Sequence, residues 1–269
     1  MRVRVCFNIR VVVPNRRNAA PMRIALFVTW ALVCSLALTS RAQAKAVESR
    51  DGNIWISDPK GPPKQITDYG NDFSPAFSPD GSRIVFVRNP AGDRAYNDLT
   101  RSGPATEVMQ LWVALVDGSQ APQLVLNSPA EVKGRQFSGF YTPQFSGDRK
   151  DIFFLIRFVA SSGAIVRLAI GTKELLYVAD AREFSVIPKG QYQGDLIVEQ
   201  HRPELTAGHR DWFYLLQPDG TKISTIGEKK RDVEYFLATY LGGDRYVGEL
   251  NECAHWNSPD WLTCINQVR

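Results

Sequence analysis

The sequence contains few of the residues and motifs from which catalytic and metal sites are usually built. It has 269 residues, with four cysteines and three histidines. It has no G-x-S-x-G elbow for acyl transfer, and neither G-x-x-x-x-G-K-[ST] nor G-x-G-x-x-G for nucleotide binding. No Cys, Asp or Glu completes a recognised metal-ligand spacing with His201 and His209. These absences predict a chain without a cofactor, without a metal and without catalytic activity.

Acidic residues are missing from the first 44 positions. That segment carries seven arginines and no Asp, Glu or Lys, although the whole chain has a formal net charge of +4. Without it, 25 Lys and Arg stand against 28 Asp and Glu, which is a formal charge of −3. Because a negative remainder removes the electrostatic reason for binding phosphates, we expect no nucleic-acid partner.

The same segment reads as a secretory leader. Fifteen uncharged residues, Ile24 to Leu38, follow Arg23 and precede the small-residue tripeptide Ala42-Gln43-Ala44, which is the order of a signal peptide with its cleavage site. A membrane anchor is the alternative, but crossing a bilayer takes roughly 20 apolar residues. We therefore expect cleavage after Ala44, a periplasmic or secreted protein, and no stable membrane span. Translation from Met1 and translation from Met22 both fit.

Cleavage would leave two cysteines. Cys253 and Cys264 lie in residues 251–269, a short C-terminal tail. An even pair in an exported protein most simply forms one disulfide, which we expect here. Metal binding is the weaker alternative because only His255 lies nearby, and a redox pair would more typically be C-x-x-C.

The chain after the leader is built from repeated hairpins. No window of eleven or more residues shows a convincing 3.6-residue period, whereas short β-branched and aromatic runs alternate with Gly, Pro, Asp and Asn. The clearest unit is SPAFSPDGSRIVFVR, from Ser74 to Arg88, in which Gly81 can take the positive φ of a tight turn. Weaker copies begin at Thr142, Glu183 and Asp232, the last running to Leu250.

A second kind of hairpin recurs between these units. In each of three copies an aromatic residue precedes a glycine turn by five positions, and a fourth copy from Ala164 lacks the aromatic. We expect the aromatics to pack between sheets rather than to form a site. The three copies pair Trp55 with Lys60-Gly61, Trp112 with Asp117-Gly118, and Tyr214 with Asp219-Gly220.

Two successive hairpins make a four-stranded antiparallel meander, and meanders repeated around an axis make a β-propeller. The predicted fold is therefore all-β, a propeller of four or five four-stranded blades over residues 45–250. The chain enters in the second half of a unit, Asn53 to Thr67, and Asp232 to Leu250 would supply a first half. These two halves would complete one blade, and both blade counts stay open.

The blade sequence resembles a known family. SPAFSPDGSRIVFVR followed by LWVALVDGSQAPQLVL is similar to the repeat of TolB-type periplasmic β-propellers, over roughly residues 51–250 and most sharply up to Leu126. The resemblance implies the propeller fold and an exported, WD-like repeat protein. Similar blades also occur in the propellers of prolyl-oligopeptidase-type peptidases, so the resemblance does not imply one function.

Long insertions predict where a site would lie. First and third turns of a meander share one end of the blade, and second turns share the other end with the links between blades. The long second turns are Asn89 to Met109 and His201 to Arg210, and the link from Asn127 to Phe140 falls at the same end. We expect these loops to bring together Arg94, Tyr96, Asn97, Arg101, His201, His209 and Arg210.

The favoured hypothesis is a non-enzymatic, exported propeller that binds a protein or a cell-envelope component through this long-loop face. The alternative is a propeller enzyme or carbohydrate-binding module that uses polar residues in the central channel. A cluster of carboxylates and histidine with shifted pKa values would favour the enzyme. An exposed apolar or aromatic patch on the loop face would favour the binding protein.

Overall fold

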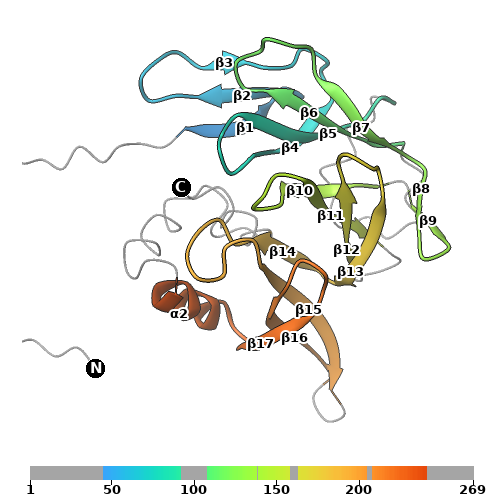
Figure 1. Ribbon diagram of the computed structural model, residues 1–269, viewed down its shortest axis with the longest axis vertical. Helices are drawn as coiled ribbons and strands as arrows, with labels where there is room; N and C mark the ends of the chain where they lie inside the picture. The colour runs from blue at the N-terminus through green and yellow to red at the C-terminus, as the bar shows by residue number, and fades with distance from the viewer. Residues whose placement is uncertain (1–44, 92–107, 138, 158–162, 205–207, 241–269) are drawn as a thin grey trace, which may run out of the picture. The chain divides into compact units, whose positions relative to one another are not determined.

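The computed structural model describes residues 45–91, 108–137, 139–157, 163–204 and 208–240. Over these residues the chain forms four antiparallel sheets of three or four strands in sequence order, together with one two-stranded sheet (Figure 1). The first sheet contains β1 (Ala46–Arg50), β2 (Asn53–Ser57) and β3 (Lys64–Gln65). The second contains β4 (Asp72–Phe77), β5 (Arg83–Arg88), β6 (Gln110–Leu115) and β7 (Gln123–Asn127).

The remaining elements continue the same pattern. The third sheet contains β10 (Tyr141–Phe145), β11 (Asp151–Arg157), β12 (Gly163–Ala169) and β13 (Leu175–Asp180). The fourth contains β14 (Glu183–Val186), β15 (Leu196–Glu204), β16 (Gly208–Leu216) and β17 (Lys222–Gly227). A two-stranded hairpin, β8 (Ala130–Val132) with β9 (Arg135–Phe137), lies between the second and third sheets in the chain, and helix α2 (Lys230–Tyr240) follows β17.

The strand order makes each four-stranded sheet a meander, as the repeat predicts. Every strand pairs with the strand that follows it, and the first strands β4, β10 and β14 contact one another in turn. Successive meanders with adjacent first strands are the blades of a β-propeller. The all-β fold class and the propeller blade are therefore confirmed.

Each pair of neighbouring sheets encloses an apolar layer, because alternate residues of a strand point to opposite faces. Ile54 and Phe86 pack between the first two sheets, and Val85 and Phe154 between the second and third. The layer between the third and fourth sheets includes Phe153, Val198 and Tyr214, which confirms a packing role for that repeated aromatic. The opposite face of the fourth sheet packs against α2.

The tight first turns are closed by their own side chains. The Ser78 hydroxyl donates to Asp80 Oδ1 at 2.6 Å and accepts from the Arg83 amide at 2.9 Å. The degenerate copy keeps the arrangement, because the Ser146 hydroxyl donates to Asp148 Oδ1 at 2.7 Å. Hydrogen bonding from Ser78 holds the pKa of Asp80 well below its usual range. Ser and Asp at this spacing therefore specify the turn.

Replacing Gly81 by valine is expected to lower the free energy of unfolding by about 1–3 kcal/mol, because Gly81 has φ +68° and a β-branched residue is strained there. Gly61 is the matched control, since it is not among the positive-φ residues and an added Cβ would meet nothing within 4 Å. Gly61→Val should change stability little. Equal midpoints in urea for both variants would contradict the turn assignment.

The hairpin expected from Asp232 to Leu250 is wrong over its described part. Residues Lys230 to Tyr240 form a helix instead, so this segment supplies no strands to complete the first blade. Val233, Phe236 and Leu237 are spaced at i, i+3 and i+4 and are buried on one face. The Asp232 carboxylate accepts from the backbone amides of Glu228 and Lys229, which stabilises the start of the helix.

The described residues contain three four-stranded blades and one three-stranded sheet. The first sheet has one strand more than expected, because Ala46 to Arg50 pairs with β2 before the predicted entry at Asn53. No described helix is long and apolar enough to cross a membrane. The predicted leader and residues 241–250 lie outside the described residues.

Candidate functional site

The structure tests only part of the predicted site. Arg94, Tyr96, Asn97 and Arg101 lie outside the described residues, as do Cys253 and Cys264. His201, His209 and Arg210 all lie on the fourth sheet, on the paired strands β15 and β16. The expected loop from His201 to Arg210 is wrong for most of its length, because β15 continues to Glu204 and β16 begins at Gly208.

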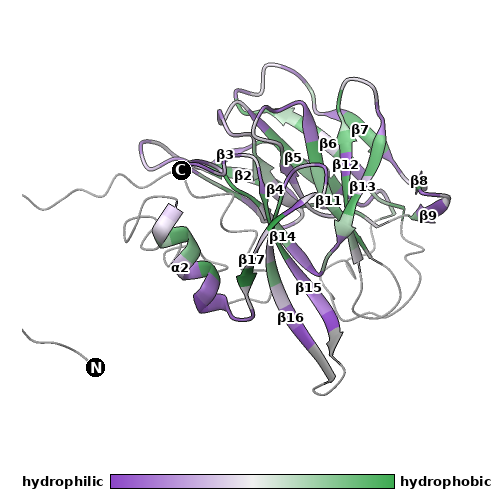
Figure 2. Ribbon diagram, turned by 60° about the horizontal axis from the view of Figure 1, so that its bottom comes forward, coloured by the Kyte–Doolittle hydropathy of each residue, from purple (hydrophilic) through white to green (hydrophobic). Residues whose placement is uncertain are grey.

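The paired ends of β15 and β16 form a ribbon, defined here as residues 201–204 and 208–211. The β14–β15 pairing is described from Glu183 opposite Glu199, and the β16–β17 pairing ends with Phe213 opposite Gly227. The ribbon continues beyond both partners to Glu204 opposite Gly208. Figure 2 shows hydrophilic residues along both strands toward this end of the sheet.

Four charged or ionisable groups meet at the base of the ribbon. His201 Nδ1 lies 2.7 Å from Asp211 Oδ1, and Arg182 donates to Asp211 Oδ2 at 3.2 Å. The Arg182 guanidinium also lies 3.6 Å from Glu199 Oε1. His201 is the direct cross-strand partner of Asp211, and Glu199 lies two residues before His201 on the same strand, so these three side chains are on one face of the ribbon. We call Arg182, Glu199, His201 and Asp211 the ribbon-base cluster.

Glu199 is the most deeply buried member of the ribbon-base cluster. Its side chain is only 9% exposed, and burial raises the pKa of its carboxyl to about 7, although the nearby Arg182 charge lowers it. It follows Ile197 at a spacing of two and lies opposite Phe213, so it continues the face that packs against α2. A carboxyl group in this position changes its charge near neutral pH.

The opposite face of the ribbon is basic and aromatic. Arg202 and Arg210 are directly opposite one another, and both are exposed. Arg202 Nε donates to Gln200 Oε1 at 2.9 Å, and its guanidinium lies 5.2 Å from the centre of the Tyr214 ring. Arg210 donates to Glu228 Oε2 at 2.9 Å. The fold therefore places Arg210 on the other face from His201 rather than beside it.

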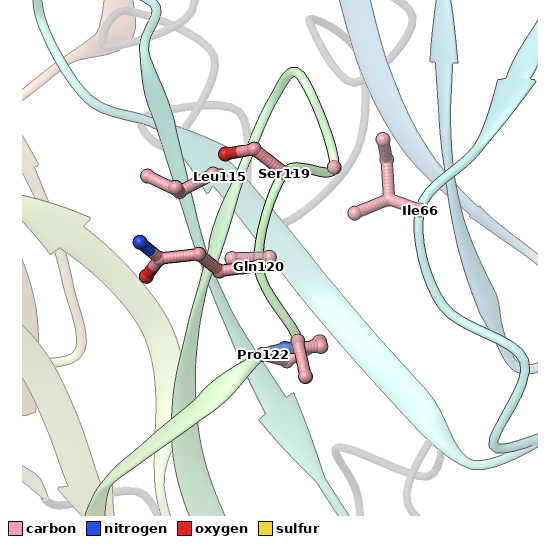
Figure 3. Close-up of a pocket in the computed structure, with 8 residues that line it drawn as sticks. Ile66, Leu115, Ser119, Gln120 and Pro122 are labelled. Carbon is pink, nitrogen blue, oxygen red and sulfur yellow. The ribbon is translucent and has the colours of Figure 1, made fainter.

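A hollow of about 250 Å³ lies where the β6–β7 turn faces the first sheet. Figure 3 shows Ile66 on one side and Leu115, Ser119, Gln120 and Pro122 on the other. Its eight lining residues include no titratable side chain. Since this hollow offers only small polar and apolar groups, it supplies no acid, base or charged anchor.

The sequence pattern missed three members of the ribbon-base cluster. Glu199 carried a usable signal, because a glutamate follows the apolar run Leu196 to Val198 at a position facing the core. Arg182 and Asp211 carried no such signal in the sequence, because the contact between them depends on the register of three strands. Among the described residues, no group of three or more His, Cys, Asp or Glu is arranged to hold a metal ion.

No protein-family model and no curated protein sequence matches the chain. Solved structures do resemble it. TolB from Acinetobacter baumannii is 18% identical with a TM-score of 0.43, over 66% of this chain and 38% of that one. A putative TolB from Agrobacterium tumefaciens is 14% identical with a TM-score of 0.44, over 64% and 55%.

The β-propeller domain of the Trilobed protease from Pyrococcus furiosus is also similar, at 15% identity and a TM-score of 0.43, over 69% of this chain and 53% of that one. The chain thus spans about half or less of each of these structures. The similar structures therefore include a TolB protein and a putative TolB, in line with the blade motif, and also the propeller domain of a protease.

Proposed function

We propose that this chain is an exported, non-catalytic propeller that binds a protein or a cell-envelope component through the end of the fourth sheet that carries the ribbon. One observation carries the proposal. The ribbon extends beyond both neighbouring strands and presents exposed arginines, whereas the tight first turns are closed by hydrogen bonds to their own Asp side chains. Projecting, polar segments on a rigid sheet are common recognition elements.

Export and the disulfide are part of the same proposal. Mass spectrometry of the exported protein is expected to give a chain that begins at Lys45. It should also show Cys253 and Cys264 together two hydrogens lighter than the free thiols. An intact leader would contradict export by cleavage, and two alkylatable thiols in the exported chain would contradict the disulfide.

Binding through the ribbon is tested by shortening it. In the variant, Gln200 is joined to Trp212, its partner across the two strands, through an Asn-Gly turn, which suits a two-residue hairpin. Chemical cross-linking in native cell envelopes should lose the partner bands seen with the wild type. An Asp117→Ala variant, altered in an exposed turn of the second sheet, is the control and should keep them. Unchanged bands in the shortened variant would refute the proposal.

A second candidate function is acid–base chemistry at the ribbon-base cluster. It is favoured by one observation, the burial that raises the pKa of Glu199 to about 7 beside His201 and Asp211. The test is hydrolysis of a panel of envelope glycans by wild type and Glu199→Gln. Activity that Glu199→Gln abolishes would favour the enzyme, and absence of turnover across the panel would favour the binding protein.

A further inference from the structure

The ribbon has two edges along which no described strand pairs. The β14–β15 ladder is described only from Glu183 opposite Glu199, and the β16–β17 ladder ends at Phe213 opposite Gly227, while the ribbon itself continues to Glu204 opposite Gly208. Backbone amides and carbonyls on an unpaired edge form a template on which an extended peptide adds as a further strand.

The edge formed by β15 is blocked. The Arg182 amide donates to the Glu199 carbonyl at 2.8 Å, so the backbone groups of Glu199 point away from β16. Backbone direction alternates along a strand, which places the nitrogen of Pro203 on the same outward edge. Because proline has no N–H, this edge lacks a donor at the position where an added strand would need one.

The edge formed by β16 keeps its donors. Glu199 lies opposite Phe213, so the backbone groups of Phe213 point away from β15 and toward β17. By the same alternation, the amides and carbonyls of His209 and Asp211 point to that side. The β16–β17 pairing ends at Gly227, and the chain enters α2 at Lys230. Within the described residues this edge is therefore open to a strand.

Charge indicates what kind of strand would fit. Arg202 and Arg210 form a directly opposed cross-strand pair, an arrangement that like charges destabilise. Arg210 is on the strand that has the open edge, and its exposed guanidinium already contacts a carboxylate, that of Glu228. A carboxylate on an incoming strand would lie beside Arg210 and reduce the repulsion between the two arginines.

We propose that the ribbon binds an extended, acidic segment of a partner protein, which adds as a strand to β16 along His209 to Asp211. This inference rests on the proposed binding function and specifies the form and charge of the partner. Main-chain hydrogen bonds supply part of the affinity, and acidic side chains on the face of Arg210 supply the selectivity.

The test uses the full mature chain and a synthetic ten-residue peptide of alternating glutamate and threonine, capped at both ends. Binding should slow hydrogen exchange of the His209 and Asp211 amides at least tenfold. Exchange of the Arg202 amide, which points into the ribbon, should not change. The same peptide with lysine in place of glutamate should have no effect on His209 or Asp211.

Two proline variants separate the edges. His209→Pro removes an outward amide while leaving the hydrogen bonds between β15 and β16 in place, and should weaken peptide binding at least tenfold. Pro203→Ala alters only the opposite edge, so the peptide should still protect the His209 and Asp211 amides to the same extent. Circular dichroism checks that both variants keep the sheet.

Three results would overturn strand addition: equal binding by His209→Pro, equal protection by the lysine peptide, or no binding of the acidic peptide at millimolar concentration. Its failure is distinguishable from failure of the proposed function. Loss of the native partner in the shortened ribbon but not in His209→Pro would leave the binding function standing and refute the added strand. Retention in both variants would refute both.

Discussion

Replacing Leu237 by alanine is expected to lower the free energy of unfolding by about 3 kcal/mol. Leu237 is fully buried on α2 and belongs to the apolar layer with Ile197, Phe213 and Leu215 of the fourth sheet. Truncation removes the apolar contacts of the side chain and leaves a cavity that the sheet cannot fill, because strands paired on both sides move little. Chemical denaturation of the mature chain measures the change.

Tyr235 provides the matched control on the same helix. Its side chain is 76% exposed, so Tyr235→Ala should change the free energy of unfolding by less than about 0.5 kcal/mol. If the two variants unfolded at the same denaturant concentration, α2 would not be packed on the fourth sheet as described.

Replacing Glu199 by glutamine is expected to stabilise the protein at pH 8 by about 3 kcal/mol and to have little effect at pH 4.5. Burial raises the pKa of Glu199 from its ordinary value of 4.5 to about 7. The folded protein therefore favours the protonated carboxyl. The stability that the folded protein gains from this protonated carboxyl is fully present below pH 4.5. It is lost as the pH rises through the folded-state pKa of about 7. Glutamine keeps the shape and carries no charge.

The measurement is the free energy of unfolding of both proteins at several pH values between 4 and 8. The difference between wild type and Glu199→Gln should grow through this window and then level off. Glu48→Gln is a suitable control, because it makes the same substitution at an exposed position on β1. A constant difference from pH 4 to pH 8 would show that Glu199 ionises normally.

Most of the fold is predictable from the sequence because turns and strands leave local signals. Ser78, Asp80 and Gly81 specify a turn through hydrogen bonds within a few residues, and the apolar runs on either side form the strands. The copy that begins at Thr142 forms the same turn although its sequence differs. Arg149 occupies the position that corresponds to Gly81 and takes φ +65°. The Ser146 and Asp148 contacts hold that turn without a glycine at the positive-φ position.

The errors fall where tertiary packing decides the local structure. In the segment from Asp232, aromatic and glycine residues are typical of a hairpin, but Val233, Phe236 and Leu237 complete a core only as a helix. At the ribbon, Pro203 favours a loop, yet pairing between β15 and β16 carries the strands past it. The ribbon-base cluster depends on register between strands, which residue type alone does not determine.

Helix α2 also has a consequence for how molecules of this protein meet one another. Stacked sheets are open-ended structures, because the outer face of the last layer resembles the faces buried inside the stack. Here Val233, Phe236 and Leu237 occupy that face on the fourth sheet, and the helix turns Tyr235 and Thr239 outward. A sheet from another copy cannot pack where the helix lies. Among the described residues, the helix thus covers the outer face of the fourth sheet, which opposes end-to-end polymerisation through that face.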